Sequence, residues 1–474
     1  MNSFDKIYRI LFALGLFFFS FNQVEVMPFL GEYIKEFGAI FFFIGFSVLC
    51  FETLYKGKIQ VPYQNTILKL IIIFYALAFI CTMLNIDTVL TNYFKRTSGI
   101  SRFIRQYVSL SIPVLIFIPF FWRVFVNMNL KESFFYVRKI LLASLLFCSF
   151  YAFWETLYTY FYIYPAKFVL SIFDILPFMN VIFHNNRIAS FTYEPPALAI
   201  YLITICGWMF SYFYTEKNFI KKVTPTILIL LLTFFSGSRT ALLVITSVFL
   251  LFVAYLFITG KFRKQIILSS VALMFAGTLV FFTNTGKLIQ IVEDKIESLN
   301  FQSNLKQSVS NKTRFGMLHA MQVTFEENPI IGVGFGQQAY HSRFHYPRWA
   351  KTNNWEFKEY YQNKKDPTFP PGYNLYVRLL AEMGIIGLLS WVSIIFYSLY
   401  KCFILIRRAN NEIEKILTIS IMFSLIGLYI NWFQIDTFRM YGFWLFIILL
   451  IKIDEYYKNY KKDYEQHDSI NTTL

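Results

Sequence analysis

Basic residues, most of them arginines, stand in the polar segments that separate the long apolar runs of this chain. They are Lys95, Arg96, Arg102, Arg105, Arg187, Arg239, Arg314, Arg343, Arg348, Arg378 and Arg439. A guanidinium group is always charged, and its planar fork matches the oxygens of a phosphate. Taken together, these residues predict a site for an anionic ligand. For any single arginine, a lipid head group is the alternative ligand.

An acidic residue follows one of these arginines in the segment Arg187–Pro196. Glu194 directly precedes two prolines, and a carboxylate at the start of a helix is favoured by the helix dipole alone. A carboxylate beside aromatic residues at a membrane interface can also act as a general base. Both interpretations of Glu194 stay open at this point.

Two further motifs lie between residues 328 and 345. The segment Asn-Pro-Ile-Ile-Gly-Val-Gly-Phe-Gly at 328–336 has no strand pattern before it and no Gly-Lys-Ser/Thr after it, so we expect a backbone turn and not a nucleotide site. His341 and His345 have a spacing that would allow one metal ion to bridge them on a helix. Pro347 and the lack of a nearby third ligand argue against this. We expect no metal site and no cofactor.

The composition indicates the solvent that surrounds these residues. The chain has 474 residues, of which 56% are hydrophobic and only 15% are charged. Soluble domains carry about a quarter charged residues, so most of this surface is expected to face lipid. A net charge of +16 would suggest nucleic acid in a soluble protein, but in a membrane protein it first reflects topology. No nucleic-acid partner is expected.

The long apolar runs predict an all-α, polytopic integral membrane protein with about twelve transmembrane helices. A bilayer core of about 30 Å needs roughly 20 helical residues, and runs that do not alternate are helices and not barrel strands. Because two runs are short, ten or eleven spans remain the alternative. The expected spans are Ile7–Val24, Ala39–Leu54, Ile67–Leu84, Tyr107–Phe125, Ile140–Ile163, Ala197–Tyr214, Val223–Phe235, Thr240–Thr259, Ile266–Phe282, Leu375–Ile406, Ile416–Phe433 and Met440–Ile453.

Lysine and arginine are concentrated in the loops on one side of these spans. The positive-inside rule makes that side cytoplasmic, so both termini are expected in the cytoplasm and the basic residues named above on the outer side. Four parts of the chain follow from this topology. They are residues 1–282 with about nine spans, an extracytoplasmic loop at 283–374, the C-terminal spans in 375–453 and a cytoplasmic tail at 454–474.

The long loop is expected to be partly helical and to lie on the membrane surface. Apolar residues recur at helical spacing in Leu288–Leu299 and again further along the loop. The second set comprises Phe315, Leu318, Met321, Gln322 and Phe325. Another outer segment, Lys167–Thr192, is also apolar enough for the interface. Loops of this length are usually lids or binding elements.

Three motifs follow one another on the predicted outer face. They are Ser-Gly-Ser-Arg-Thr-Ala at 236–241, the Arg314 segment leading to 328–336, and 373–388 with its Tyr-Asn pair and Glu-Met-Gly-Ile-Ile-Gly. Together they resemble the O-antigen polymerase and ligase superfamily of bacterial surface-polysaccharide assembly, directly over roughly the second half of the chain. Arg187–Pro196 is similar to Arg/Ser/Glu-Pro segments of Wzy-type polymerases. Ligases typically have a His-Asn pair where this chain has Tyr373 and Asn374.

The resemblance implies a metal-independent glycosyltransferase. Such enzymes transfer a glycan from an undecaprenyl diphosphate carrier to a sugar hydroxyl, and the polymerases use a second lipid-linked repeat unit as the acceptor. The residues then expected to bind the diphosphate are Arg187, Arg239 and Arg314, with Arg102, Arg105 and Arg378 as weaker candidates. The expected catalytic residues are Glu194 as general base, Tyr373 as a positioning group and His341 as a reserve.

The expected partners are an undecaprenyl-diphosphate-linked oligosaccharide, membrane lipids and a chain-length regulator protein. The expected location is the bacterial cytoplasmic membrane, with the active site facing outward. Two alternatives stay open: a ligase that transfers finished polymer to lipid A–core or to a protein, and a transporter of the same lipid-linked sugar. Transporters tend to have related halves and polar sites at mid-membrane, which this sequence does not display.

Overall fold

The computed structural model describes residues 3–25, 33–58, 61–176, 178–184, 186–260 and 308–471. This part of the chain is mostly helical, which confirms the all-α prediction, and its strands are the short pair β1 (Tyr93–Phe94) and β2 (Thr97–Ser98). The α-helices are α1 (Ser3–Phe17), α2 (Phe37–Lys56), α3 (Thr66–Leu84), α4 (Ile86–Thr91), α5 (Gly99–Ile112), α6 (Ile118–Phe125), α7 (Leu130–Thr159), α8 (Pro165–Ser171), α9 (Pro195–Phe210), α10 (Tyr212–Thr215), α11 (Phe219–Ser236), α12 (Arg239–Ile258), α16 (Val309–Glu327), α17 (Gln338–His345), α18 (Arg348–Lys351), α19 (Trp355–Phe357), α20 (Leu375–Arg408), α21 (Glu412–Asn431) and α22 (Tyr441–Asn471). Short 3-10 or π turns are η1 (Phe18–Ser20), η3 (Pro113–Phe117), η4 (Ile172–Ile175) and η5 (Lys358–Gln362).

Nine helical segments in the described ranges are long and apolar enough to cross a membrane, and each coincides with one of the twelve predicted spans. Of the other three predictions, the first corresponds to α1, which has only 15 residues before η1. The prediction at Ile266–Phe282 lies outside the described residues. The last corresponds to the first half of α22, where charged residues follow the apolar run at once. The nine segments are Phe37–Lys56, Thr66–Leu84, Gly99–Phe125, Leu130–Thr159, Pro195–Thr215, Phe219–Ser236, Arg239–Ile258, Leu375–Arg408 and Glu412–Asn431.

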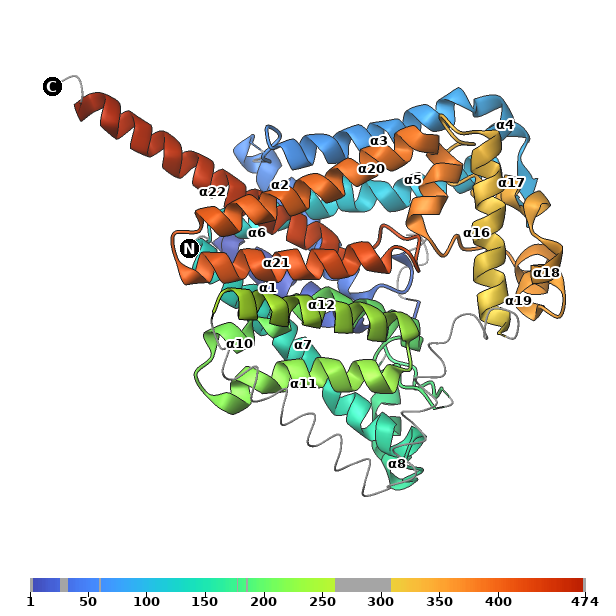
Figure 1. Ribbon diagram of the computed structural model, residues 1–474, viewed down its shortest axis with the longest axis horizontal. Coiled ribbons are helices and arrows are strands. Elements are labelled where there is room, and N and C mark those ends of the chain that lie inside the picture. The colour runs from blue at the N-terminus through green and yellow to red at the C-terminus, as the bar shows by residue number, and fades with distance from the viewer. Residues whose placement is uncertain are drawn as a thin grey trace.

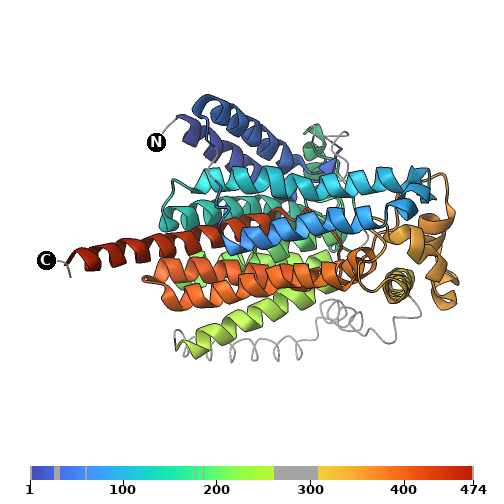
Figure 2. The same cartoon turned by 90° about the horizontal axis from the view of Figure 1, so that it is seen from above.

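The spanning helices lie side by side, and α16 runs across one end of their bundle (Figure 1). Both chain termini lie at the opposite end (Figure 2). The part of the predicted outer loop that is described, residues 308–374, therefore lies away from both termini. The two ends of the chain thus lie at one end of the bundle, and the cytoplasmic location of that end stays a prediction.

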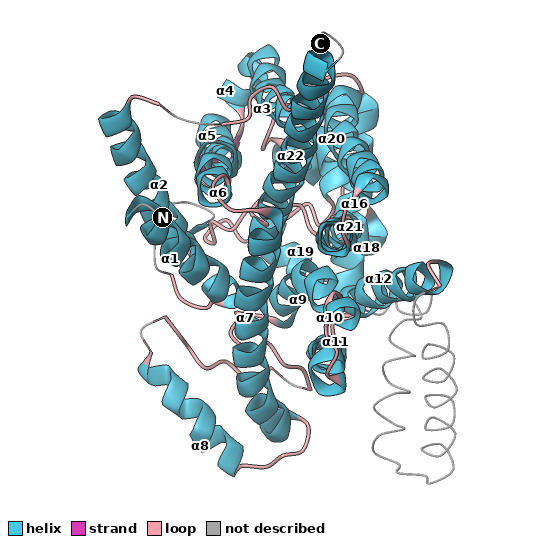
Figure 3. Cartoon of the chain, turned by 90° about the vertical axis from the view of Figure 1, so that its left-hand side faces the viewer, coloured by secondary structure: helices cyan, strands magenta, loops and turns pink. Residues whose placement is uncertain are grey.

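Helices α9, α21 and α22 form the centre of the bundle. A Cβ atom at Gly207 of α9 would lie 2.5 Å from the carbonyl oxygen of Ser420 on α21, so the close approach of these helices requires glycine. The apolar first half of α22 is buried and passes through the middle of the molecule (Figure 3). Just beyond it, the buried Lys452 donates hydrogen bonds to the carbonyls of Phe125 and Met128.

The glycine-rich segment 328–336 packs against a break in α20. At Gly384 the backbone leaves the helical conformation, with φ of +63° and ψ of −160°, and a Cβ atom there would lie 2.2 Å from the Ile330 carbonyl oxygen. Three backbone hydrogen bonds of 2.9 to 3.0 Å join residues 329–334 to residues 381–385. Both glycine motifs thus serve one structural contact, as expected for a backbone turn.

Helix α16 occurs where the apolar spacing predicts a helix, and the face that it buries in the protein only partly overlaps the predicted apolar face. Met321 of the predicted face is buried and Phe315 and Gln322 are exposed, whereas Gly316, Met317 and Ala320 are buried outside it. The reason is tertiary: α16 packs against α17, α18 and α19, which the spacing alone does not place. The other predicted surface helix, around residues 288–299, lies outside the described residues.

The second outer segment folds as α8 and η4, on the side of α7 away from the bundle centre (Figure 3). Phe168, Ile172 and Ile175 are 74%, 52% and 80% exposed there. Apolar residues exposed along a short helix fit the predicted position in the membrane interface.

Candidate functional site

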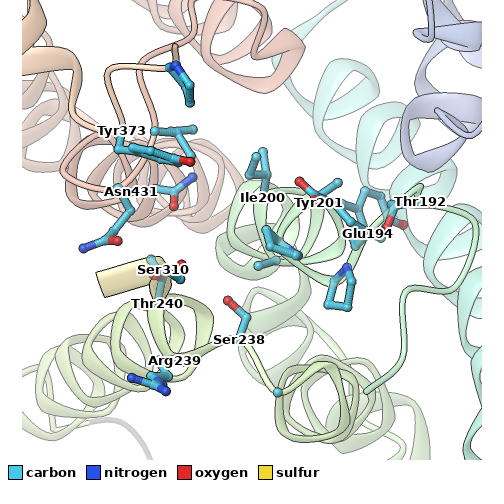
Figure 4. A pocket seen from close by; sticks show the side chains of 18 of the residues that line it. Thr192, Glu194, Ile200, Tyr201, Ser238, Arg239, Thr240, Ser310, Tyr373 and Asn431 are labelled. Carbon is cyan, nitrogen blue, oxygen red and sulfur yellow. Dashed lines mark hydrogen bonds between the residues drawn. The ribbon is translucent and has the colours of Figure 1, made fainter. Parts of the chain in front are cut away.

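A cavity of about 1460 Å³ lies at the end of the bundle that α16 crosses. Its walls come from segments far apart in the sequence: the residue before α2, the segment leading into α9, the α11–α12 turn, α16, the start of α20 and the α21–α22 connection. In Figure 4, Glu194, Arg239, Tyr373 and Asn431 surround one space. The predicted site residues that line this cavity are Arg187, Glu194, Arg239, Arg314 and Tyr373.

The turn between α11 and α12 presents Arg239 to the cavity. Gly237 ends α11 in the left-handed conformation, with φ of +62°, and the Ser238 hydroxyl caps α12 by accepting a hydrogen bond from the Ala241 amide at 3.3 Å. Glycine and serine are what such a turn needs. Arg239 is not required by the turn, and within the described residues its guanidinium has no hydrogen bond or ion pair.

Arg187 ties the segment before α9 to that same turn. Its guanidinium donates hydrogen bonds to the carbonyl oxygens of Ser236 and Gly237, at 3.1 and 3.3 Å. These carbonyls lie at the C-terminal end of α11, where the helix dipole favours a positive charge. Arg187 therefore has a structural contact and a place on the cavity wall.

The three cavity arginines are close enough to act on one another electrostatically. Burial lowers the pKa of Arg187, Glu194 opposes that effect, and the positive charges of Arg239 and Arg314 lower the pKa further. In the described part of the chain no carboxylate forms an ion pair with any of the three. Like charges without a counter-ion destabilise one another, and a bound anion relieves this.

Arg314 reaches the cavity from α16. Its guanidinium donates to Gln434 Oε1 at 2.9 Å and lies 5.0 Å from the ring centroid of Tyr373, while its Nε is buried without a partner. Tyr373 has a φ of +57°, which is rare for an aromatic residue, and the neighbouring Gly372 amide is held by Asp436 Oδ2 at 2.7 Å. Burial raises the pKa of Tyr373 well above its ordinary value, so the phenol stays neutral.

Hydrogen bonds from buried polar groups fix the segment that carries Glu194. The two carboxylate oxygens of Glu155 on α7 accept hydrogen bonds from the amides of Ala189 and Ser190, at 2.9 and 2.8 Å. Gln23 donates to the Ser190 carbonyl at 3.3 Å. Glu194 is the N-cap residue of α9, but its side chain makes no capping hydrogen bond. The carboxylate is therefore not used to cap the helix, and it lies on the cavity wall.

Residues 225–392 match the family described as O-antigen ligase. This match confirms the resemblance to the O-antigen polymerase and ligase superfamily. The family indicates a function of polymerase or ligase type in surface-polysaccharide synthesis. The matched region includes Arg239, Arg314 and Tyr373, whereas Arg187 and Glu194 precede it. No curated protein matches the chain.

Four residues that the superfamily resemblance suggested do not line the cavity: Arg102, Arg105, Arg378 and His341. Arg378 is buried, and its guanidinium donates to Glu382 Oε1 at 3.1 Å, to Gln106 Oε1 at 2.7 Å and to the Asp436 carbonyl at 2.7 Å. Arg102 lies over the ring of Phe369, 4.6 Å from its centroid. The contacts of Arg378 are those of a structural residue that fixes the neighbouring segments.

The two histidines of α17 have separate surroundings. His345 Nε2 lies 3.0 Å from Glu327 Oε2. Burial lowers the pKa of His341, which does not line the cavity. Among the residues that the structure describes, no three His, Cys, Asp or Glu side chains are grouped as a metal site requires.

The cavity also includes residues that the sequence did not single out as site residues: Glu36, His184 and Arg439. Glu36 Oε2 accepts a hydrogen bond from the Tyr441 hydroxyl at 3.2 Å. Burial raises the pKa of Glu36, and Arg439 opposes this effect. Arg439 belongs to the set of outer basic residues in the sequence, and that pattern could have predicted a place for it at the site. Nothing in the local sequence distinguishes Glu36 or His184, because only the fold brings their loops to the cavity.

Proposed function

We propose that the protein is a polymerase of a bacterial surface polysaccharide, such as O-antigen or capsule. It transfers glycan from an undecaprenyl diphosphate carrier to the non-reducing end of a lipid-linked repeat unit, on the outer face of the cytoplasmic membrane. Membrane lipids and a chain-length regulator protein are its other proposed partners. The observation that carries the proposal is the cluster of Arg187, Arg239 and Arg314 on the cavity wall, without carboxylate partners in the described structure.

The chemistry of the reaction matches this cluster. The departing diphosphate gains negative charge in the transition state, and fixed guanidinium groups stabilise such charge without a metal ion. Glu194 is the proposed general base for the acceptor hydroxyl, and Tyr373 positions the guanidinium of Arg314. A cavity of about 1460 Å³ is larger than the roughly 300–1,000 Å³ of ordinary small-molecule sites, which suits two glycan ends.

The test is a reaction with one substrate. Purified protein is incubated with a lipid-linked repeat unit alone, and the products are separated by length. A ladder of lengths from the wild type that is absent with Arg239→Ala supports the proposal. A wild type that makes no ladder, yet transfers preformed polymer to another acceptor, contradicts it.

The second candidate function is an O-antigen ligase, and the description of the matched family favours it. The presence of Tyr373 where ligases typically have histidine favours the polymerase. A cellular experiment separates them: loss of a polymerase leaves single repeat units on the surface, whereas loss of a ligase leaves polymer on the carrier lipid.

A further inference from the structure

The cavity has a second charged group, which is distinct from the arginine cluster. Glu36 and Arg439 act electrostatically on each other, and neither is among the groups that shift the pKa of Arg187. Tyr193 is near both groups, because Glu194, Arg439 and Glu36 all influence the pKa of its hydroxyl. The cavity thus has one wall with the three arginines and Glu194, here called the cationic wall, and a second wall with Glu36 and Arg439.

Glu36 is held in a fixed place on the second wall. The hydrogen bond at 3.2 Å to Glu36 Oε2 comes from Tyr441, whose ring is 1% exposed and packs against Phe42 and Phe117 at centroid distances of 5.4 and 5.5 Å. The Glu36 amide also donates to the Tyr33 carbonyl at 3.1 Å. A carboxyl that is fixed at both backbone and side chain loses little entropy when it binds a ligand.

The surroundings of Glu36 suit a neutral, hydroxyl-rich ligand. The ring of Tyr193, which is 39% exposed, lines the same cavity and offers a flat apolar surface to the C–H face of a sugar ring. Burial raises the pKa of Glu36, so its carboxyl takes up a proton more readily than an exposed glutamate. A carboxylate accepts hydrogen bonds from sugar hydroxyls, and a protonated carboxyl both donates and accepts.

We propose that Glu36 binds a hydroxyl group of the acceptor glycan and helps to select the acceptor. This inference rests on the proposed function, because it assigns the cationic wall to the donor diphosphate and the Glu36 wall to the second substrate. Glu36 is a binding residue in this account, and Tyr441 is a positioning residue that acts through it.

The test separates the two substrates chemically. The donor is a lipid-linked repeat unit whose non-reducing terminal hydroxyl is blocked, so it can only donate. The acceptor is the same repeat unit on a simple aryl group, which lacks a diphosphate and can only accept. Steady-state kinetics then give a separate KM for each substrate in wild type, Glu36→Gln, Tyr441→Phe and the control Glu326→Gln, whose side chain is exposed on α16.

Glu36→Gln is expected to raise the acceptor KM at least tenfold, while the donor KM and kcat change by less than about threefold. Tyr441→Phe is expected to change the acceptor KM in the same direction but less, and Glu326→Gln not at all. Binding of undecaprenyl diphosphate at wild-type affinity shows that each variant is folded. An unchanged acceptor KM in folded Glu36→Gln, or a raised donor KM instead, overturns the inference. A wild type that cannot join the two substrates overturns the proposed polymerase itself, and the inference with it.

Discussion

Arginines at the two ends of the bundle have different partners. At the end that holds the termini, the arginines paired with carboxylates are Arg9, Arg123 and Arg138, at distances of 2.6 to 3.1 Å. At the other end, Arg187, Arg239 and Arg314 line the cavity and contact carbonyl, amide or ring atoms. A paired guanidinium is satisfied within the protein, whereas an unpaired cluster is available to an anionic ligand.

Arg378 shows that position alone does not make a ligand-binding arginine. It lies at the cavity end of α20, yet Glu382 and Asp436 lie within 3.1 and 3.8 Å of its guanidinium. Its charge is balanced inside the protein, as at the opposite end of the bundle. A counter-ion inside the protein, and not position at one end of the bundle, therefore distinguishes Arg378 from the arginines proposed to bind the diphosphate.

The largest effect is expected from removing an unpaired guanidinium. Arg239→Ala and Arg314→Ala each remove one charge that is proposed to stabilise the departing diphosphate, so kcat/KM for the lipid-linked repeat unit should fall about 100-fold to 1,000-fold. Arg348→Ala is the matched control, because Arg348 is exposed and does not line the cavity. Near-normal polymer synthesis by Arg239→Ala at normal protein level would remove the diphosphate assignment.

Removing a paired guanidinium should affect stability instead. Arg123 contacts Asp5 and Glu52 at 2.8 and 2.9 Å, and all three side chains are largely buried. Arg123→Ala removes the guanidinium that both carboxylates share, and within the described residues only Glu52 keeps a second cation, Lys56 at 2.7 Å, so the free energy of unfolding should fall by about 3 kcal/mol. Thermal unfolding in detergent measures the loss. Activity per folded molecule should stay near that of wild type, and a large loss of kcat in the folded fraction would contradict the distinction between the two ends.

A smaller effect is expected when the charge is kept but its geometry is changed. Arg187→Lys retains a cation on the cavity wall but cannot hold both Ser236 and Gly237 with a planar fork. We expect kcat/KM to fall about tenfold. Full activity in this variant would mean that the contact with the α11–α12 turn does not help to place Arg239.

The smallest effect concerns the pH dependence of stability. Burial raises the pKa of Glu36 above its ordinary 4.5, so its contribution to stability is fully present below that value and is lost as the pH rises through the raised pKa. Glu36→Gln has no titrating carboxyl at this position, so its stability does not fall in this way as the pH rises. The unfolding temperature of wild type should therefore decline relative to the variant as the pH rises above 4.5. Parallel curves for the two proteins would show that the carboxyl is not buried enough to matter.

The spanning helices were predictable because length and apolar composition are strong local signals. The run at Thr240–Thr259 needs no partner to be recognised, and α12 begins and ends within one residue of it. The buried face of α16 was not predictable because it depends on packing with α17 to α19, and the position of Phe315 and its neighbours on the membrane surface stays a prediction.

The site was predictable only in part, for a similar reason. Arg187, Arg239 and Arg314 stood out because basic residues are uncommon in loops that are predicted to lie outside the cytoplasm. The fold brings all three to one cavity. Whether an arginine has a counter-ion is a property of the fold, so Arg378 could not be separated from the others. Glu36 lies beside the cavity only because α2 and α22 meet there.

The central proposal is that the unpaired arginines bind a lipid diphosphate. The direct measurement is the dissociation constant of undecaprenyl diphosphate for wild type and for the triple variant Arg187→Gln, Arg239→Gln, Arg314→Gln, with Arg348→Gln as control. We predict affinity at least 100-fold weaker in the triple variant, because each charged contact contributes about 1.5–3 kcal/mol, and no change in the control. Wild-type affinity in a folded triple variant would contradict the proposal.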